Sequence, residues 1–330
     1  MLEELVERYG RRVVQAFMGH VRANAAEHVR KALARFGSEK RSFVDRMDDG
    51  TPISVEIRFE NGRAVFDFTG TGPESPGNLN APPAVVRSAV LFVLRCLVEE
   101  RIPLNEGCLD PLEIVLPHPS ILSPSPGRAV VGGNVETSQA VVGVLLGAFG
   151  AAAASQGTMN NIAFGDETFG YYETIAGGVG ASEGYAGASG VHSHMTNTRI
   201  TDAEVLETRH PIRLVGFSLR RGSGGLGRFP GGDGVERRFR FLKDLSVSLL
   251  TERRVNPPFG LAGGGPGMRG ENLRIALSGE RVSLGGKASY EASAGEELIV
   301  LTPGGGGWGK TDADRRPPRK AARERLRSGF

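Results

Sequence analysis

Apolar positions at helical spacing open the chain. Across residues 2–36 they recur every three or four positions, which predicts one long amphipathic helix. The pattern then changes to a period of two, since apolar and polar residues alternate over 53–59 and again over 64–68. Asn61 and Gly62 lie between these two runs, and Asn-Gly at such a place is the strongest short-range signal of a β-hairpin.

Two further helices are predicted in the first half of the chain. Residues 84–100 follow a pair of prolines, which the first turn of a helix tolerates, and they are apolar nearly all round. A helix with that pattern is expected at the centre of a core. Residues 137–155 form a third apolar stretch, in which the hydroxyl of Thr137 or Ser138 would cap the first turn.

The second half of the chain is typical of short strands, turns and glycine loops. Short runs between residues 273 and 303 predict a terminal series of strands. Helices followed by strands, without regular β-α-β alternation, favour an α+β fold over a doubly wound sheet. We therefore expect a helix-rich α+β part at 1–156, a glycine-rich β part at 157–309 and a disordered basic tail at 310–330.

Composition narrows the class of protein. Glycine accounts for 48 of the 330 residues, about twice its usual share of ~7%. It is densest at 157–234, which predicts a surface of tight turns and short strands that serves a ligand or a partner. Only two cysteines are present, Cys96 in an apolar run, where burial is expected, and Cys108 in a predicted loop. With neither a long apolar run nor the order of a signal peptide, a reduced, cytoplasmic protein is expected.

The formal net charge of +3 is concentrated at the C-terminus. Residues 310–330 carry five more basic than acidic side chains, which leaves about −2 on the rest of the chain. We therefore expect no basic face suited to nucleic acid. The tail is interpreted as a solvated end, with docking or nucleic-acid binding as the alternative.

Residues 304–311, GGGGWGKT, match the P-loop pattern after a predicted strand. The phosphate-binding mechanism requires a helix directly after the Lys-Thr pair, because the first amides of that helix hold the phosphates. Pro317 and Pro318 follow the Lys-Thr pair too closely for a helix of useful length. Only 19 residues follow Thr311. We interpret the segment as a glycine turn after the last strand, with Trp308 packed on the body, and keep an independent P-loop ATPase as a minor alternative.

Two histidines in the glycine-rich part are candidates for chemistry. His192 and His194 are separated by one residue, so on a strand both imidazoles would face the same side and share one metal ion or one substrate. A metal would require a third ligand, for which Glu173, Glu204 and Glu207 qualify by residue type alone. The alternative is that these polar side chains only satisfy the loop backbone.

A second candidate lies at the predicted start of the third helix. Asn134 and Glu136 belong to the segment GGNVETSQ, and backbone amides at a helix N-terminus favour anionic or carbonyl-bearing groups. Helix capping alone is the alternative. Arg228, in the glycine cluster 222–234, would bind a carboxylate or phosphate, although a plain turn cluster explains that segment equally well.

A series of short motifs, each weak by itself, jointly resembles the hydantoinase B family. That family includes the B subunits of ATP-dependent hydantoinases, the C-terminal part of 5-oxoprolinases, and related acetone and acetophenone carboxylase subunits. The motifs are DFTGTG (67–72), Asn80, NEG (105–107), GNVETSQ (133–139), YYETIAGG (171–178), GVHSHMTNT (190–198), EVLE (204–207), SGGLGR (223–228), GGDG (231–234) and TPGGGGWG (302–309).

The resemblance implies ATP-dependent hydrolytic opening of a cyclic amide, hydantoin or 5-oxoproline, or else ATP-dependent carboxylation of a ketone. A separate A-type subunit would use the ATP and activate the substrate, and the B-type part would take the intermediate onward. The residues expected at the site are Glu173, His192 and His194 for acid–base chemistry, and Asn134, Glu136, Asn197 and Arg228 for positioning the carbonyl or carboxylate groups of the substrate.

One departure from the family pattern concerns the N-terminus. Family B subunits are longer there, and the additional half resembles a metal-binding region with N-D-P-Y and G-G-T-H motifs, neither of which occurs here. We therefore expect the divalent metal in that half, which an upstream B-type polypeptide would contribute to a split enzyme. The alternative is a truncated, non-catalytic subunit that scaffolds the A-type ATPase or an upstream B half.

Overall fold

The structure is a computed structural model that describes residues 1–311 apart from 61, 99, 101–104 and 197; the predicted tail from 312 onward lies outside the described residues. The helices are α1 (Leu2–Tyr9), α2 (Arg11–Ala34), α3 (Pro83–Leu97), α4 (Ser138–Phe149) and α5 (Ala203–Arg209), with the short turns η1 (Glu106–Leu109, 3₁₀ type) and η2 (Gly133–Thr137, π type). The strands are β1 (Arg41–Arg46), β2 (Pro52–Glu60), β3 (Arg63–Asp67), β4 (Leu112–Val115), β5 (Asn161–Gly165), β6 (Gly170–Glu173), β7 (Ile212–Arg220), β8 (Gly234–Phe241), β9 (Leu245–Leu250), β10 (Glu271–Ile275), β11 (Arg281–Ser283), β12 (Lys287–Ala292) and β13 (Glu297–Leu301).

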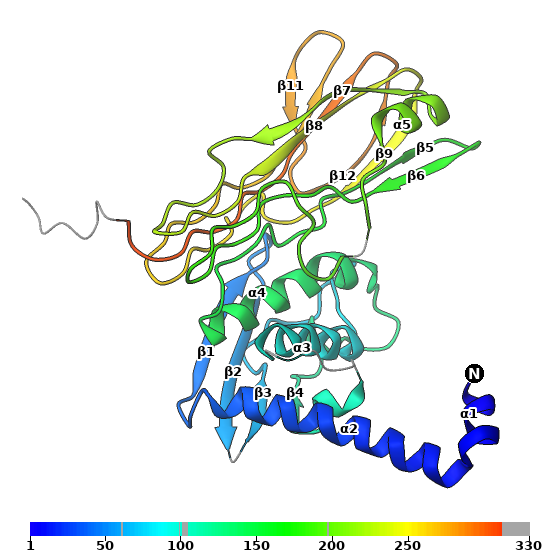
Figure 1. The fold of residues 1–330 in the computed structure, drawn as a ribbon. Coiled ribbons are helices and arrows are strands. Elements are labelled where there is room, and N and C mark those ends of the chain that lie inside the picture. Colours follow the sequence, from blue (N-terminus) through cyan, green and yellow to red (C-terminus); the bar gives the residue numbers. More distant parts are fainter. Residues whose placement is uncertain (61, 99, 101–104, 197, 312–330) are drawn as a thin grey trace, which may run out of the picture.

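The strands form three sheets, one in the lower part of the molecule in Figure 1 and two in the upper part. The first sheet, in the order β1-β2-β3-β4, packs against α2 and α4, and α3 packs on α4. The other two sheets, β11-β10-β13-β8-β7 and β12-β9-β5-β6, enclose a second core that includes Phe164, Val247, Phe239 and Val300. Every strand pair is antiparallel except β3 with β4. The predicted α+β fold, with helices first and strands later, is confirmed.

Helix α4 is the centre of the first core. Eleven of its twelve residues are buried, and it contacts β1, β2 and α3. The prediction that the second helix is central was wrong, because α3 exposes Arg87 and Ser88 on one face, whereas α4 contains no charged residue. Thr137 and Ser138 do not cap α4, since their hydroxyls donate to the carbonyl oxygens of Leu79 and Asn134.

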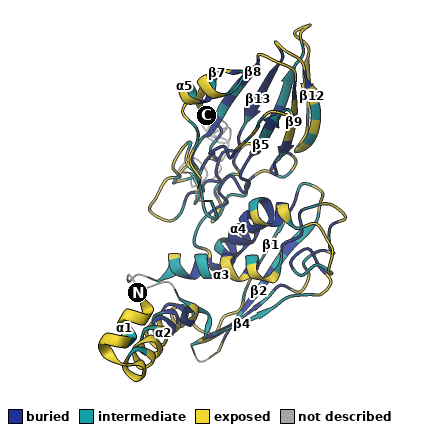
Figure 2. Ribbon diagram, turned by 90° about the vertical axis from the view of Figure 1, so that its right-hand side faces the viewer, coloured by how far each residue is buried: buried dark blue, intermediate teal, exposed yellow. Residues whose placement is uncertain are grey.

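Two helices, and not one, form the N-terminus. Gly10 has a φ of 80° and separates α1 from α2, because a residue in that conformation cannot continue an α-helix. No residue of α1 is buried, and Figure 2 shows α1 and the first turns of α2 as exposed. None of the helices in the described part of the chain combines the length and apolar character needed to cross a membrane.

The predicted hairpin and the predicted terminal strands are confirmed. Strands β2 and β3 pair in antiparallel register across the turn at Gly62, which has a φ of 72°. The terminal series is β10 to β13. The two cysteines are the reverse of expectation, since Cys96 is exposed at the end of α3 and Cys108 is buried in η1.

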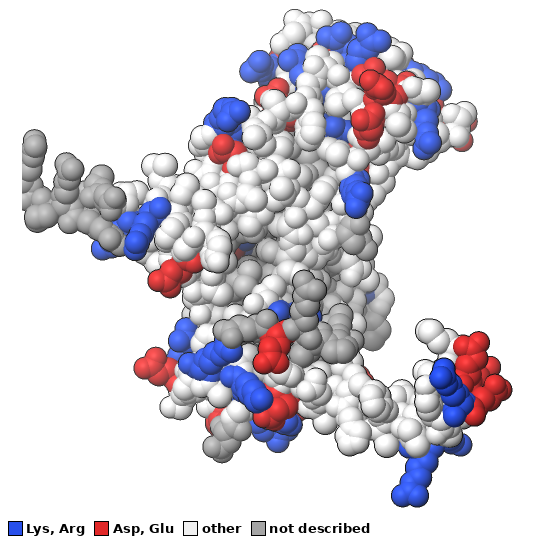
Figure 3. Space-filling model, in the orientation of Figure 1, with Lys and Arg blue, Asp and Glu red and all other residues white. Residues whose placement is uncertain are grey.

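Glycine-rich backbone fills the region between the two cores. The segment 303–309 runs through it in an extended conformation outside any sheet. Its amides donate in different directions: Gly304 and Gly307 to the carbonyls of Met268 and Gly265, and Gly305 to that of Gly232. Gly304 and Gly307, three residues apart, thus bond to the same neighbouring segment. Three residues is also the period of a polyproline II helix. In Figure 3 the middle of the molecule shows few charged side chains, which gather at its two ends.

Close backbone contacts explain why these positions are glycine. A Cβ added at Gly304, Gly305, Gly306 or Gly307 would lie 1.9, 2.1, 1.9 or 2.2 Å from a carbonyl oxygen of a neighbouring segment. The glycines were predicted to build a surface of tight turns. Many instead lie in the interior, because only glycine permits several chains to pack backbone against backbone.

Replacing Gly305 by alanine is expected to destabilise the protein by more than about 3 kcal/mol, since the new methyl group would meet the carbonyl oxygen of Val179 at 2.1 Å. The matched control is Gly19→Ala in α2, where no atom lies within 4 Å of the added Cβ and where alanine stabilises a helix by up to about 1 kcal/mol. Thermal denaturation compares the two, and an unchanged Tm for G305A would contradict this packing.

Candidate functional site

The segment with the two predicted histidines docks on the first turn of α4. Gln139 holds it there: its side-chain amide donates to the carbonyl oxygen of His194 at 2.6 Å, and its Oε1 accepts from the hydroxyl of Ser193 at 3.3 Å. On a strand the two imidazoles would face the same side, but 192–196 is loop held by these contacts. His194 thereby contacts Gln139, which follows the predicted Glu136 by three residues.

His194 is kept neutral by its surroundings. Its ring lies near that of Phe92, with the centroids 5.9 Å apart, and Nε2 lies 3.4 Å from the carbonyl oxygen of Gln139. Because that oxygen only accepts, Nε2 carries the proton and Nδ1 keeps a lone pair. Burial lowers the pKa of His194 to about 4, and the charge of Arg253 acts in the same direction. The neutral imidazole has the form that a general base requires.

Glu136 is fully buried where η2 leads into α4. Its Oε1 accepts from the side-chain amide of Asn161 at 2.8 Å and from the backbone amide of Met159 at 3.3 Å. Its Oε2 has no hydrogen-bond partner among the described residues. Burial raises the pKa of Glu136 well above its usual value, against an opposing effect of the Thr158 hydroxyl, and the charge of Glu252 raises it further. Burial thus favours the protonated form of this carboxyl group, which can donate a proton, over the carboxylate.

A chain of polar groups leads from Glu136 to the surface. Asn161, which donates to Glu136, also donates to the carbonyl oxygen of Leu250 and accepts from the hydroxyl of Tyr172. Tyr172 is exposed overall, and partial burial raises the pKa of its hydroxyl group. This arrangement gives the buried carboxyl group a hydrogen-bonded connection to solvent through one amide side chain.

Two residues that the sequence did not single out extend this network. Glu252 is buried, accepts from the backbone amide of Asp48 at 2.7 Å, and pairs with Lys287 at 3.1 Å. Arg254 is buried beside it and donates to the side chain of Asn160 at 2.7 Å. The run TERRVNPP gave no local signal of this burial, because consecutive charged residues are typical of a solvated surface.

Glu173 lies elsewhere, in a buried ion pair between the two upper sheets. Arg237 binds it with both nitrogens of one fork, Nε to Oε1 at 2.6 Å and Nη2 to Oε2 at 2.8 Å. The hydroxyl of Tyr171 also donates to Oε2 at 2.6 Å. Both charged side chains are 1% exposed, and the guanidinium lies between the rings of Phe217 and Phe239. Such a carboxylate is occupied in holding the sandwich together.

The remaining predicted residues do not join this network. Asn134 is exposed, and its backbone oxygen accepts from Ser138. His192 is half-buried, and desolvation lowers its pKa. Arg228 is exposed over the ring of Phe229, beside a small cavity of about 290 Å³. Asn197 lies outside the described residues. Among the residues that are described, no group of three histidine, cysteine or acidic side chains could hold a metal ion.

The glycine part of the P-loop match, Gly304 to Gly309, has no free amides to offer a phosphate. Each backbone amide from Gly304 to Gly309 donates to a carbonyl oxygen of a neighbouring segment. Trp308 forms bridges with Phe229 and Leu261. A phosphate cradle requires those amides to point at the ligand. The interpretation of GGGGWGKT as a structural glycine segment is consistent with this geometry.

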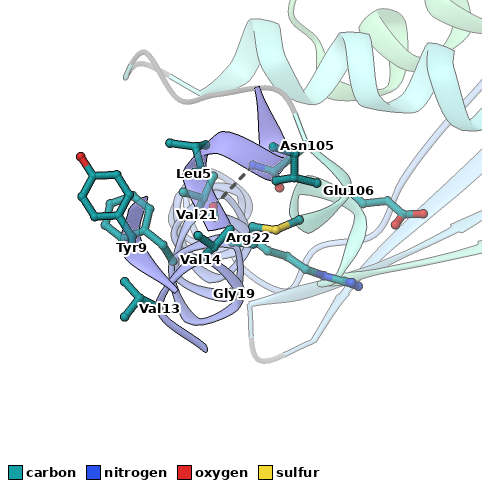
Figure 4. Close-up of a pocket in the computed structure, with 12 residues that line it drawn as sticks. Leu5, Tyr9, Val13, Val14, Gly19, Val21, Arg22, Asn105 and Glu106 are labelled. Atoms are coloured by element: carbon teal, nitrogen blue, oxygen red, sulfur yellow. Dashed lines mark hydrogen bonds between the residues drawn. The ribbon is translucent and has the colours of Figure 1, made fainter. Parts of the chain in front are cut away.

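An apolar groove of about 930 Å³ lies along α1 and α2 (Figure 4). Leu5, Tyr9 and Val13 line it, and Asn105 and Glu106 lie at its side. Its wall also includes Phe17, which is 67% exposed. Few polar groups converge in it, which is unlike a catalytic pocket and typical of a protein-binding surface.

Comparison with known proteins gives this geometry its context. A family model described as "Hydantoinase B/oxoprolinase" matches residues 1–311. The chain belongs to the hydantoinase B/oxoprolinase family. It is 51% identical over 325 residues to 5-oxoprolinase 1 of Arabidopsis thaliana and 48% identical over 322 residues to 5-oxoprolinase of Dictyostelium discoideum, with 94% and 95% of this chain covered. In both cases the match covers 26% of the relative, so this family member spans about a quarter of their length.

Other comparisons concern proteins of lower sequence identity. A Pseudomonas protein described as a putative B-type component of a D-/L-hydantoinase is 26% identical over 335 residues, covering 93% of this chain and 56% of that protein. The ATP-dependent caprolactamase of Pseudomonas jessenii has the same fold, with a TM-score of 0.82 at 22% identity, over 96% of this chain and 59% of that one. Nucleotide-free acetone carboxylase has a TM-score of 0.79 at 17% identity, over 93% and 50%.

The buried Glu136 carboxyl group is expected to add a pH-dependent contribution to the free energy of unfolding. The variant Glu136→Gln should remove that contribution. The native state keeps the proton above pH 4.5, the ordinary pKa, whereas the unfolded state releases it, so this group lowers the free energy of unfolding as pH rises, by up to about 1.4 kcal/mol per pH unit. Chemical denaturation between pH 4.5 and 8 should show the variant gaining stability relative to the parent as pH increases. Parallel curves over that range would contradict the raised pKa, and the acid end provides the internal reference.

Proposed function

We propose that this chain is the C-terminal part of a hydantoinase B/oxoprolinase-type subunit that takes part in ATP-dependent hydrolytic opening of a cyclic amide. The observation that carries the proposal is the 51% identity to a 5-oxoprolinase over 94% of this chain. An A-type ATPase would activate the substrate with ATP, and this part would act on the activated intermediate. A cytoplasmic location belongs to the same proposal.

We favour 5-oxoproline over hydantoin as the substrate. Identity to two 5-oxoprolinases is 51% and 48%, against 26% to the hydantoinase component. The acetone carboxylase likeness concerns the fold alone, at 17% identity. Ketone carboxylation and a non-catalytic scaffolding role are therefore the weaker alternatives.

Within this part, His194 and Glu136 are the groups with the chemistry to move a proton. A neutral imidazole with its lone pair on Nδ1 accepts a proton, and a protonated buried carboxyl group donates one. Asn134, Asn197 and Arg228 remain predicted substrate contacts, and His192 remains a predicted acid–base residue. Glu173 also remains a predicted acid–base residue, although its ion pair with Arg237 supports a structural role better.

We further propose that the apolar face of α1 and α2 binds the part of the B-type fold that this chain does not span. Two observations support this. The groove leaves Leu2, Tyr9, Val13, Phe17 and Met18 at least half exposed, and only 59% of the caprolactamase chain and 56% of the hydantoinase chain match this one. The additional length would lie in the same polypeptide or in a separate one, together with the divalent metal that the family resemblance implies.

The test of function begins with isolation of the chain from its native cells and identification of the polypeptides that co-purify. We expect an A-type ATPase and the remaining B-type half in fixed stoichiometry, and ATP-dependent conversion of 5-oxoproline to glutamate by that complex. In the complex, His194→Ala should lower kcat by about 10²–10⁴-fold, the usual contribution of a general acid or base. A complex that consumes neither 5-oxoproline nor hydantoin with ATP would overturn the proposal.

The docking face predicts a separate outcome for Phe17→Asp. A carboxylate in the middle of the apolar groove should weaken association with the remaining B-type part at least about tenfold, since burying an unpaired charge is costly. The isolated chain should keep its Tm, because Phe17 is exposed. Gln15→Asp is the control, an exposed residue of α2 outside the groove. Equal affinities for the two variants, measured by titration calorimetry, would rule this face out.

A further inference from the structure

Another cavity, of about 760 Å³, lies at one end of the five-stranded sheet. It shares no lining residue with the α1–α2 groove. Arg220 from the end of β7, Arg254 from the loop after β9, and Arg269 before β10 line it. Asn272 lies in its wall, and Glu271 is the acidic residue among its lining. Its size is in the range of small-molecule sites, and its lining carries more positive than negative charge.

Arg254 is the most enclosed of these cations. It is 9% exposed and donates to three neutral oxygens: the side chains of Asn160 and Asn272, at 2.7 and 2.9 Å, and the backbone of Glu252 at 2.7 Å. Its Nε has no acceptor among the described residues. Burial lowers its pKa to about 10, so the guanidinium remains charged at neutral pH.

Two nearby carboxylates, Asp48 and Glu252, are engaged with other groups, and burial favours the protonated form of a third carboxyl group, Glu136. Asp48 accepts from the backbone amides of Arg254, Val255 and Asn256, at 2.7 to 2.9 Å. Glu252 pairs with Lys287. Within the described part of the chain, no carboxylate lies within ion-pair distance of the Arg254 guanidinium, which leaves a buried cation without a direct counter-ion.

Arg220, at the end of β7, is likewise a cation that donates to neutral oxygens. Its Nη1 donates to the backbone oxygens of Arg269 at 2.6 Å and Thr302 at 3.3 Å, and it too has no carboxylate within ion-pair distance among the residues described. Burial lowers its pKa, and the charge of Glu271 at the rim opposes that effect. Two half-satisfied guanidinium groups that face one cavity form a site whose missing component is an anion.

We propose that this cavity binds a small oxyanion, a carboxylate or a phosphate group, between Arg220 and Arg254. The fork of a guanidinium matches two oxygens of either anion, and Asn272 fixes Arg254 in place for that contact. The inference does not depend on the proposed function.

Titration calorimetry of the purified chain with inorganic phosphate and with L-glutamate tests the site. We expect saturable binding of at least one of them, weakened about tenfold by Arg220→Gln and strengthened severalfold by Glu271→Gln, which removes the opposing charge. Arg221→Gln is the matched control, since it removes the same charge from the neighbouring exposed residue outside the cavity and should change affinity less than twofold. Arg254 is left intact because its three hydrogen bonds hold the fold.

The two probes separate the sources of the anion. Saturable binding of phosphate alone assigns the site to phosphate groups, and binding of glutamate alone assigns it to carboxylates. No saturable binding of either probe would overturn the proposal, and so would equal losses in R220Q and R221Q, which would indicate only the net charge of the surface.

Discussion

Segment 303–309 is surrounded by backbone from distant parts of the chain, and almost every other feature depends on that contact. Its amides and carbonyls bond to segments near residues 154, 178, 232 and 265. One short stretch therefore contacts segments that lie about 40 to 150 positions earlier in the chain. The contacts leave no room for a Cβ. Glycine costs conformational entropy on folding, and here that cost is offset by hydrogen bonds that satisfy the interior backbone.

This bundle positions the polar network by fixing its neighbours. The amide of Gly306 bonds to Ala154 and that of Gly178 to Pro303, which sets the path of the chain just before Thr158 and Asn161. Those residues in turn contact Glu136 at the start of α4. The junction between the α+β layer and the sandwich is therefore polar and buried, and the residues with unsatisfied buried polar atoms in its described part include Glu136, Gln156, Glu252, Arg253 and Arg254.

The buried ionisable groups in the described part of the molecule are of two kinds, those in an ion pair and those without one. Glu173 and Arg237 neutralise each other in a bidentate pair, which is expensive to break and leaves nothing free for chemistry. Glu136 avoids that cost by staying protonated, and Arg254 retains its charge with neutral acceptors only. Groups of the second kind respond to ligands and pH, since their environment leaves one protonation state or one contact incomplete.

Local patterns in the sequence determined much of the fold. The alternation on either side of Gly62 specified the hairpin, the terminal runs specified β10 to β13, and the order of helices and strands specified the α+β class. These signals depend on neighbours in the chain, which is why they could be read without a structure. The joint order of the glycine motifs also indicated the family, because each motif marks a position where the backbone admits no side chain.

Tertiary structure alone decided which groups meet. Helices α3 and α4 are both apolar, and only their packing shows that α4 is the enclosed one. The spacing of His192 and His194 suggested a strand, but contacts with Gln139, more than 50 residues earlier, hold them in a loop. Glu173 looked available until Arg237 was placed beside it, and Glu252 and Arg254 gave no local sign of sharing a network with Glu136. Charge, burial and protonation depend on residues distant in the chain, so the sequence determined the elements and the fold determined their chemistry.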